Sequence, residues 1–366
     1  MVRRCNKCVL PDTVPGVEFD EAGICNHCRG YRGSVTEYDF EGKDEEFKQL
    51  LEKQRQRRLR KDLKYDVLAP ISGGRDSTYT VWKLVKEYDM KVLCANYKNP
   101  FTSSQAQKNI QNLIQKLGID LVEFPDKYGL HFKSFKTNLR AWLKNPDLAS
   151  ANLMCIACQS IYINLFQIAK KNKIELIVAG ANPYEITGFK AESQGVDDLD
   201  KKRITKLVST YSKKVMRDRA YIKFVNIIPA FNAAMSLYGD APYLRWRYPK
   251  ITKSAFFYYF PYKEDEIHKV LDSIGWKKAE DNPSPWRFDC EVDSVKNYIY
   301  KKLIGATEKD DLFSRYIRAG IMSREEAIER LEKETVNIDI VKRVLGMAGV
   351  ELSELDEALE RANATK

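Results

Sequence analysis

The segment Ser72-Gly73-Gly74-Arg75-Asp76-Ser77 contains the residue types of a phosphate-binding loop. Its adjacent glycines let the backbone approach an anion closely, and its serine hydroxyls and its guanidinium add hydrogen-bond donors. Asp76 has the same sign of charge as phosphate, so we expect it to orient the loop or to meet a phosphate-bound Mg²⁺. The spacing differs from the P-loop motif, in which Gly-Lys-Ser/Thr follows four variable residues. The residues therefore indicate a nucleotide-phosphate site of another kind.

The surrounding residues predict a strand before this loop and a helix after it. An apolar run, 65–71, precedes the loop, and a helix-like run, 77–85, follows it. The first N–H groups of a helix lack intrahelical partners and the helix dipole is positive there, so this junction suits an anion. The alternative interpretation is an ordinary turn between a strand and a helix.

The middle of the chain continues this alternation of short apolar runs and amphipathic runs. It predicts an α/β fold, a parallel sheet flanked by helices. We expect strands at 65–71, 91–97, 120–125 and 174–180, and helices at 77–88, 102–117, 131–144 and 158–171. Farther on we expect a helical segment at 221–246, a strand at 255–260 and a mostly helical C-terminal region.

Ligands of parallel sheets bind beyond the carboxyl ends of the strands, which gives further candidate site residues. Asn96 and Gly180 lie at the carboxyl ends of expected strands and join Ser72–Ser77 as candidates for phosphate binding. The residues after Gly180 are candidates for substrate binding, together with two residues of the Pro- and Trp-rich run 283–290; they are Asn182, Tyr184, Glu185, Arg287 and Asp289.

Lys263 is a candidate catalytic residue beside Arg75 and Asp76. It lies between an expected strand and an expected helix, and a lysine there could balance the charge of a triphosphate. The alternative is a solvated lysine. His131 and His268 lie in helical patterns, where we expect core or surface residues instead of ligands.

Two Cys-x-x-Cys pairs near the start predict a metal site. The pairs are separated by 16 residues, a spacing that fits a tetrahedral four-thiolate zinc site, and they consist of Cys5, Cys8, Cys25 and Cys28. A redox role is the alternative, but four thiolates on one ion leave none free. His27 lies inside the second pair, although the spacing favours the flanking cysteines.

A third group of cysteines, Cys155, Cys158 and Cys290, has three open interpretations. They could bind a metal or an iron–sulfur cluster. Cys155 and Cys158 could instead be redox active, because a helix start favours thiolates. They could also be small buried residues lining a pocket.

The length and the charge of the chain indicate its domain organisation and the kind of partner it could bind. The chain has 366 residues and a formal net charge of +10, concentrated at 53–64 and 201–219. A basic surface suits an anionic partner, whereas either run alone could be a solvated helix face. We found neither a membrane-length apolar run nor a signal-peptide segment, and therefore expect a cytoplasmic protein with its cysteines reduced. We divide it into a zinc unit at 1–33, a connecting helix at 34–64, a nucleotide domain at 65–262 and a mostly helical region at 263–366. We expect this last region to complete the active site and to provide a partner surface.

Ser72–Ser77 resembles the SGGxDS signature of the PP-loop ATP pyrophosphatases, with Arg75 where many relatives have lysine. The resemblance implies that ATP is cleaved between its α and β phosphates and that a substrate oxygen is adenylated. The stretches 5–28, 154–158, 180–183 and 286–290 resemble the N-acetyl sugar amidotransferases of bacterial lipopolysaccharide O-antigen and nonulosonate biosynthesis.

This second resemblance implies conversion of a sugar acetamido group to an acetamidino group on a nucleotide-linked sugar, with ATP and Mg²⁺. It also implies separate partners that supply ammonia: a glutaminase similar to that of imidazole-glycerol-phosphate synthase, and its cyclase-like barrel companion. We expect no membrane or nucleic-acid partner. The main alternative is a tRNA thiolation enzyme with an iron–sulfur cluster on Cys155, Cys158 and Cys290, and a third hypothesis is a nucleotide-sensing or zinc-dependent interaction module.

Overall fold

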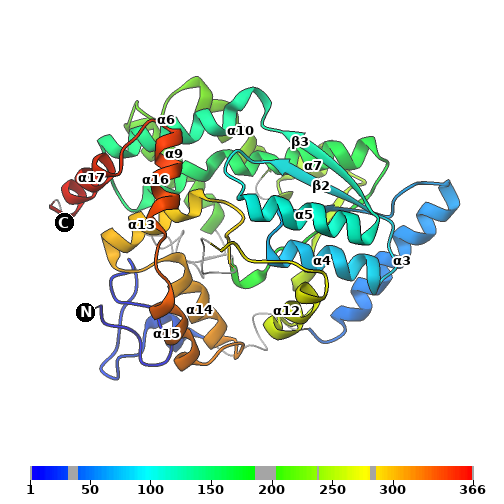
Figure 1. The fold of residues 1–366 in the computed structure, drawn as a ribbon, viewed down its shortest axis with the longest axis horizontal. Coiled ribbons are helices and arrows are strands. Elements are labelled where there is room, and N and C mark those ends of the chain that lie inside the picture. The colour runs from blue at the N-terminus through cyan, green and yellow to red at the C-terminus, as the bar shows by residue number, and fades with distance from the viewer. Residues whose placement is uncertain (1, 32–39, 186–202, 237–238, 281–285, 365–366) are drawn as a thin grey trace.

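A five-stranded parallel sheet with the order β3-β2-β1-β4-β5 forms the centre of the molecule (Figure 1). This computed structural model describes residues 2–31, 40–185, 203–236, 239–280 and 286–364. The strands are β1 (Val67–Pro70), β2 (Val92–Lys98), β3 (Asp120–Pro125), β4 (Leu176–Ala179) and β5 (Thr252–Ala255). The expected α/β fold, with a parallel sheet between helices, is confirmed.

The strand order reverses between β1 and β4. From β1 the chain moves outward through β2 to β3, and it then returns to place β4 on the other side of β1, with Leu68 opposite Ile177. In open parallel sheets the crevice at such a reversal is where ligands bind. The loop after β1 and the residues after β4 therefore lie side by side at the ligand-binding edge.

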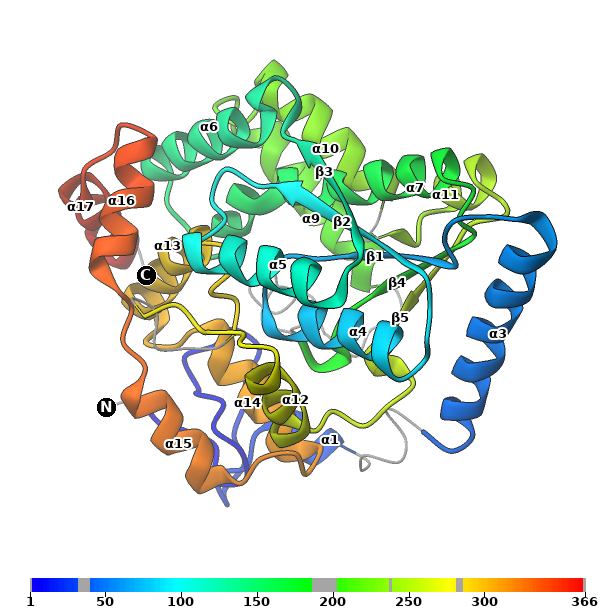
Figure 2. The same cartoon turned by 45° about the vertical axis from the view of Figure 1, so that its right-hand side comes forward.

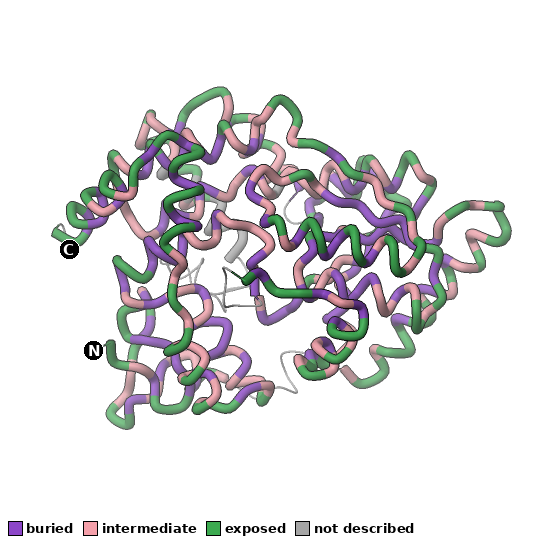
Figure 3. The backbone as a smooth tube through the Cα atoms, viewed as in Figure 1, coloured by how far each residue is buried: buried purple, intermediate pink, exposed green. Residues whose placement is uncertain are grey.

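Alternate residues of the strands face two separate layers of helices. Val67 and Ala69 face one layer, which contains α4 (Arg75–Lys86), α5 (Ser104–Leu117) and α12 (Glu264–Ser273). Leu68 faces the other, which contains α7 (Ile161–Lys171) and α11 (Pro242–Arg247). The central strands β1, β2 and β4 are mostly buried, whereas the edge strands β3 and β5 are largely half-buried or exposed (Figure 3). Burial on both faces explains why the central strands read as continuous apolar runs.

The N-terminal segment packs against the C-terminal helices (Figure 2). Arg4 pairs with Asp310 at 2.5 Å, and the backbone N–H of Val9 donates to Ser314. This C-terminal part consists of α13 (Val292–Ile304), α14 (Glu308–Arg318), α15 (Arg324–Lys333), α16 (Ile338–Met347) and α17 (Leu352–Ala364). The two ends of the chain thus form one packed body beside the sheet domain.

The remaining elements are mostly helices around the sheet. They are α1 (Asn26–Gly30), α3 (Lys43–Lys61), α6 (Leu130–Lys144), α9 (Arg203–Arg217) and α10 (Phe224–Ser236), with 3-10 turns η1 (Lys127–Gly129), η2 (Ala149–Ser160), η3 (Pro183–Glu185) and η5 (Phe256–Tyr258).

Two of these elements differ from the sequence-based expectation. The expected helical segment at 221–246 is two helices, α10 and α11, and Pro242 opens the second. The expected strand at 255–260 is mostly the turn η5, because its aromatic side chains pack into a cluster around Phe47 of α3 instead of extending a strand.

Among the described residues, one helical stretch, Ala149–Lys171, is long and apolar enough to cross a membrane, with a mean hydropathy of 1.3. It comprises η2 and α7, and Leu165, Phe166 and Ala169 are buried against the sheet. This is the packing of a core segment.

Gly73 is a position where the fold requires glycine. Its φ is 82°, and a Cβ there would lie 2.1 Å from the backbone oxygen of Ala106 in α5. We expect Gly73→Ala to lower the free energy of unfolding by about 3 kcal/mol or more, measured in urea, because backbone strain and overpacking add. Gly16→Ala is the matched control, since Gly16 has a φ of 80° and no atom near the added Cβ. Equal losses in the two variants would contradict the steric explanation.

Candidate functional site

The loop Ser72–Ser77 joins β1 to α4 and leaves the start of that helix open. Gly74 is the N-cap residue and provides no side-chain cap. Inside the loop, the hydroxyls of Ser72 and Ser77 lie 3.2 Å apart, and Thr78 Oγ1 donates to the Gly74 carbonyl at 2.7 Å. The first amides of α4 therefore have no side-chain acceptor from the cap position, which is the arrangement that receives a phosphate.

Gly180 fixes how closely the end of β4 approaches this helix start. A Cβ on Gly180 would lie 2.7 Å from the Asp76 backbone oxygen and 2.8 Å from Ser77 Cα. Only a glycine lets the two backbones touch in this way. The prediction that Gly180 belongs beside the loop is thus matched by its position.

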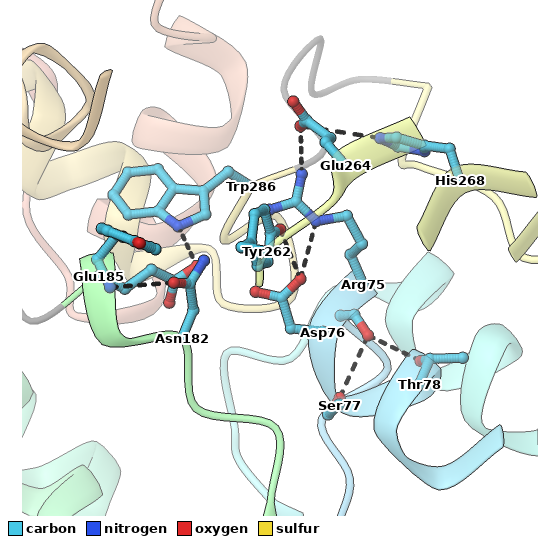
Figure 4. A network of polar contacts seen from close by, with 12 residues as sticks. Arg75, Asp76, Ser77, Thr78, Asn182, Glu185, Tyr262, Glu264, His268 and Trp286 are labelled. Atoms are coloured by element: carbon cyan, nitrogen blue, oxygen red, sulfur yellow. Dashed lines mark hydrogen bonds and ion pairs between the residues drawn. The ribbon is translucent and has the colours of Figure 1, made fainter. Parts of the chain in front are cut away.

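Arg75 is the centre of a buried polar network (Figure 4). Its Nε donates to Asp76 at 2.9 Å, its Nη1 donates to Glu264 at 2.6 Å, and its guanidinium lies over the Tyr262 ring. The Tyr262 hydroxyl donates to the same Asp76 oxygen at 2.9 Å. Arg75 therefore ties the loop to α12 and orients Asp76, and it does not face solvent.

Glu264 remains charged within this network. Burial alone would raise its pKa, but the hydrogen bond from His268 and the charges of Arg75 and Arg330 hold the pKa of Glu264 at about 2. His268, expected to be a core or surface residue, is thus half-buried beside this carboxylate. The anchor of the loop is consequently an ion pair across the whole neutral pH range.

A cavity of about 330 Å³ opens in front of the loop and collects most of the predicted site residues. It is lined by Ser72, Gly74, Arg75, Asp76, Ser77, Gly180, Glu185, Arg287 and Asp289, all predicted, and by Trp286, Asp293 and Lys296. Cys155, Cys158 and Cys290 also line it. Residues separated by more than two hundred positions in the sequence thus share one cavity.

One wall of this cavity is a buried group of charges. Lys296 Nζ lies 2.8 Å from Glu308 and 3.2 Å from Asp293, and Arg287 Nη1 lies 2.5 Å from Glu308. Arg287 has a φ of 53°, a conformation uncommon for arginine. Because Glu308 is fully buried between the two cations, it holds both of them at the wall.

Glu185 faces the phosphate loop across the cavity. Its Oε1 accepts a hydrogen bond from Trp286 Nε1 at 2.5 Å. Burial and the nearby Asp76 carboxylate raise the pKa of Glu185 to about 7, although Arg287 and Arg75 oppose the shift. Asp289 is shifted in the same direction, since burial raises its pKa while a hydrogen bond with Ser72 opposes this. With its pKa near 7, Glu185 can therefore accept or donate a proton near neutral pH.

The three cysteines lie at the other side of the cavity. Cys158 Sγ is 3.3 Å from His131 Nε2, and the Tyr97 hydroxyl is 3.1 Å from His131 Nδ1. Burial lowers the pKa of His131 to about 4, so the imidazole is neutral. Burial also raises the pKa of Cys290 to about 12. His131 is thus a core residue, as expected, but it also contacts a cavity cysteine.

Some predicted site residues lie elsewhere. Lys263 is exposed at the start of α12 and lines a smaller cavity next to Tyr79 and Glu266. Asn96 donates to the Ile71 carbonyl and faces a groove along α5. These two side chains are not among those lining the loop cavity.

Asn182 and Tyr184 do not line the cavity but hold the turn that carries Glu185. Asn182 donates to the Tyr316 hydroxyl at 2.9 Å and accepts from the backbone N–H of Tyr184. Both residues are buried, and Tyr184 packs edge-on against Tyr316. They hold the turn that presents Glu185. Residues 283–285 of the Pro-rich run and 201–202 of the basic run lie outside the described residues.

The sequence reasoning missed Lys296 and Tyr262. Lys296 lies on the apolar face of α13, between Val292 and Ile299, and this placement of a lysine is a readable signal for a buried charge. Tyr262 directly precedes the predicted Lys263, but its contact with Asp76 depends on how β5 and η5 turn the chain, which the residue types alone do not give.

The four N-terminal cysteines form a metal-binding cluster. Their Sγ atoms all lie within 4.8 Å of one another, with Cys8 3.8 Å from Cys25 and Cys5 4.0 Å from Cys28. Metal–sulfur bonds of about 2.3 Å in a tetrahedron put sulfur atoms about 3.8 Å apart, so the donors fit one ion. Across the described ranges, no other group of three or more Cys, His, Asp or Glu side chains is drawn together in this way.

The metal cluster is held by arginines of the C-terminal helices. Arg324 Nε donates to the carbonyl oxygens of Cys5 and Cys8, and Arg318 Nη1 lies 3.7 Å from Cys8 Sγ. Positive charge next to thiolates offsets their net negative charge on a divalent ion. The cluster therefore fastens the N-terminal segment to α14 and α15.

Comparison with known proteins gives one relative of similar length and two solved structures of low similarity. No family model matches the chain. An uncharacterized protein of Methanocaldococcus jannaschii, MJ1599, is 19% identical over 344 residues, which cover 93% of this chain and 97% of that protein. Its description names no activity.

The first structure is the U34-tRNA thiolase NcsA from Methanococcus maripaludis with its [4Fe-4S] cluster (16% identity, 92% of this chain, 90% of that chain, TM-score 0.31). The second is NMN synthetase from Francisella tularensis (13% identity, 64% of this chain, 96% of that chain, TM-score 0.27). Both scores are too low to carry a conclusion, so fold and site rest on the strand order and contacts described above.

Removal of one cluster ligand tests the metal site. We expect Cys8→Ser to lose the bound metal and to lower the free energy of unfolding by about 4 kcal/mol or more, because metal binding is coupled to folding of this segment. Metal content by mass spectrometry and urea unfolding measure the two effects. Cys94→Ser, at a buried cysteine of β2 outside the cluster, should keep the metal; loss of metal in both variants would contradict the assignment.

The raised pKa of Glu185 predicts a pH-dependent stability. Below about pH 4.3 the carboxyl is protonated in both the folded and the unfolded chain, and stability is full. As the pH rises to about 7, the unfolded chain ionises first, so wild type loses stability relative to Glu185→Gln, by about 3 kcal/mol at most. Urea unfolding of the two proteins at pH 5 and pH 8 measures this difference, with the exposed Glu360→Gln as the control. A wild-type advantage that grows with pH would contradict it.

Proposed function

We propose that the protein is an ATP-dependent amidotransferase that converts an acetamido group of a nucleotide-linked sugar to an acetamidino group. One observation carries the proposal. A single cavity joins the open start of α4, in the SGGxDS-like loop, to a wall of buried proton-transfer and charged groups, namely Glu185, Arg287 and Lys296. The N-terminal resemblance, residues 5–28, supports the amidine-forming reaction within the PP-loop chemistry.

The first half of the reaction is adenylation of the substrate. The amide oxygen attacks the α-phosphorus of ATP, an O–P bond forms, and the bond between the α- and β-phosphates breaks to release pyrophosphate. The amides at the start of α4 and the hydroxyls of Ser72 and Ser77 face the leaving phosphates. Such preorganised donors stabilise the developing charge.

The second half replaces the activated oxygen with nitrogen. Ammonia attacks the imidate carbon, a C–N bond forms, the attacking nitrogen loses a proton, and the C–O bond breaks to release AMP. Glu185 is the proton acceptor that we assign to this step, because its carboxyl lines the cavity and its pKa lies near 7. A base with a pKa near the working pH is the most effective one.

Two metals accompany this function. Mg²⁺ bound with ATP supplies charge neutralisation at the phosphates, and Asp76 and Asp289 are the carboxylates beside the loop that would hold it. We assign zinc to the four-cysteine cluster, because a closed tetrahedral thiolate site with no open position is typical of structural zinc.

The ammonia comes from a separate glutaminase and its barrel companion, and the protein works in the cytoplasm on sugars destined for surface polysaccharide such as the lipopolysaccharide O-antigen. The resemblance of the N-terminal stretch to the sugar amidotransferases supports both statements. Substitution of the loop must therefore abolish turnover with free ammonium as well as with glutamine.

A second function is favoured by a separate observation. Cys155, Cys158 and Cys290 line the same cavity as the phosphate loop, where an iron–sulfur cluster would serve a tRNA thiolation enzyme. Anaerobic purification separates the two. A brown protein with absorbance near 400 nm, lost in Cys290→Ser, would favour thiolation, and a colourless zinc protein would favour the amidotransferase.

The direct test follows AMP and pyrophosphate with an N-acetylated nucleotide sugar and ammonium. We expect Asp76→Asn to lower turnover by roughly 100-fold, since it removes the charge while keeping an acceptor for Arg75 and Tyr262. Asp89→Asn is the control, because Asp89 has a positive φ that asparagine tolerates and lies outside the cavity. Wild type that forms no AMP with any such sugar would overturn the proposal.

A further inference from the structure

Helix α10 buries polar side chains and exposes large apolar ones. It buries Asn226, Pro229 and Ser236. It exposes Phe224, Ile227 and Phe231, by 73, 55 and 61% respectively. Surface helices of globular proteins normally do the opposite.

Both polar atoms of the buried Asn226 side chain have hydrogen-bond partners, so this face of α10 is fixed inward. Asn226 donates to Asn138 at 2.7 Å and to the Tyr221 carbonyl at 3.0 Å, and it accepts from Ser134 at 2.8 Å. A buried amide with this many partners fixes which face of the helix points inward. The three apolar residues are consequently held outward by the same contacts.

Exposed cations precede these apolar residues in the chain. The end of α9 and the turn into α10 expose Met216 and Ile222, together with the basic side chains of Lys213, Arg217, Arg219 and Lys223. The acid in this stretch, Asp218, is already bonded to Asn145 and to the backbone N–H of Ala220. A second copy of the chain would bring like charges together across a two-fold interface, which is unfavourable.

We propose that this face, defined by Phe224, Ile227 and Phe231 with its basic rim, docks the protein that supplies ammonia. The inference rests on the proposed function. The spacing i, i+3, i+7 is that of a helix inserted into an apolar groove of a partner, and the rim requires an acidic border on that groove. The stripe is about 10 Å long, from seven residues at 1.5 Å each, shorter than the helices that lie on membranes.

The position of α10 connects this face to the cavity. Its inner side packs on η2, which carries Cys155 and Cys158, and on α6, which carries His131. Cys155 and Cys158 line the cavity of the phosphate loop, and His131 contacts Cys158. A partner docked on α10 is therefore one helix layer from the place where ammonia is consumed.

The test uses the full-length metal-loaded protein and a purified glutaminase–barrel pair of the kind that the proposed function requires. In sedimentation velocity we expect wild type to bind the pair and the double variant Phe224→Asp/Phe231→Asp to bind roughly 30-fold more weakly or not at all. Glutamine-driven AMP formation should fall with binding, while ammonium-driven AMP formation stays at the wild-type level. Lys223→Glu should weaken binding and reduce its salt dependence.

Leu59→Asp, at an exposed leucine of α3, is the matched control and should change neither binding nor turnover. Wild type that does not bind the pair, or a double variant that binds normally, would overturn the docking surface. So would self-association of wild type, or sedimentation with phosphatidylglycerol vesicles, that the double variant abolishes. Absence of ammonium-driven AMP formation in wild type would instead refute the proposed reaction, and the two failures are thus distinguishable.

Discussion

The contacts of Glu308 hold the charged wall of the cavity to helix α14. This carboxylate is fully buried at the start of α14 and bonds both Arg287 and Lys296, which form the charged wall of the cavity. Removal of one partner of such a group leaves an uncompensated charge in a medium of low dielectric constant, which is strongly destabilising. The wall can therefore exist only while α14 is in place, and α14 is held in turn by the N-terminal segment through Asp310 and Ser314.

This arrangement gives the metal cluster a role in the site even though it is remote from the phosphate loop. The four cysteines hold the N-terminal segment in one conformation, while Arg324 of α15 donates to its carbonyl groups and Arg318 of α14 contacts Cys8 Sγ. The cluster thus acts on the chemistry by positioning α14 and Glu308. A structural metal that positions a charged wall contributes to substrate binding through geometry, as outer contacts do around catalytic metals.

Local signals in the sequence were enough to predict the strands around β1, the loop Ser72–Ser77 and the four-cysteine cluster. These features depend on residues that are close in the sequence. Apolar runs predict the strands, adjacent glycines predict the loop, and the spacing of the cysteines predicts the cluster. The wall of the cavity was only partly predictable. Arg287 and Asp289 were picked from an unusual loop, but Lys296 was missed, because its burial depends on Glu308 twelve positions away on another helix.

Other misplacements have the same physical origin. Lys263 was favoured by its place between two elements, yet the chain turns at η5 and brings the Tyr262 hydroxyl to Asp76 while Lys263 faces outward. Asn182 and Tyr184 carry functional residue types, but pairing with Tyr316 turns them into supports for Glu185. The residue types and the predicted ends of the strands were enough to locate the crevice. Tertiary contacts determine which side chains line it.

The packing of the N-terminal segment on α14 and α15 has a consequence for synthesis of the protein. The cluster cysteines, 5–28, are made before the sheet domain, whereas their packing partners, at 308–333, are made after it. Contacts of such long sequence separation form late and slowly. The nascent chain must therefore keep four reduced thiols available, or already loaded with metal, while nearly the whole sheet domain is translated.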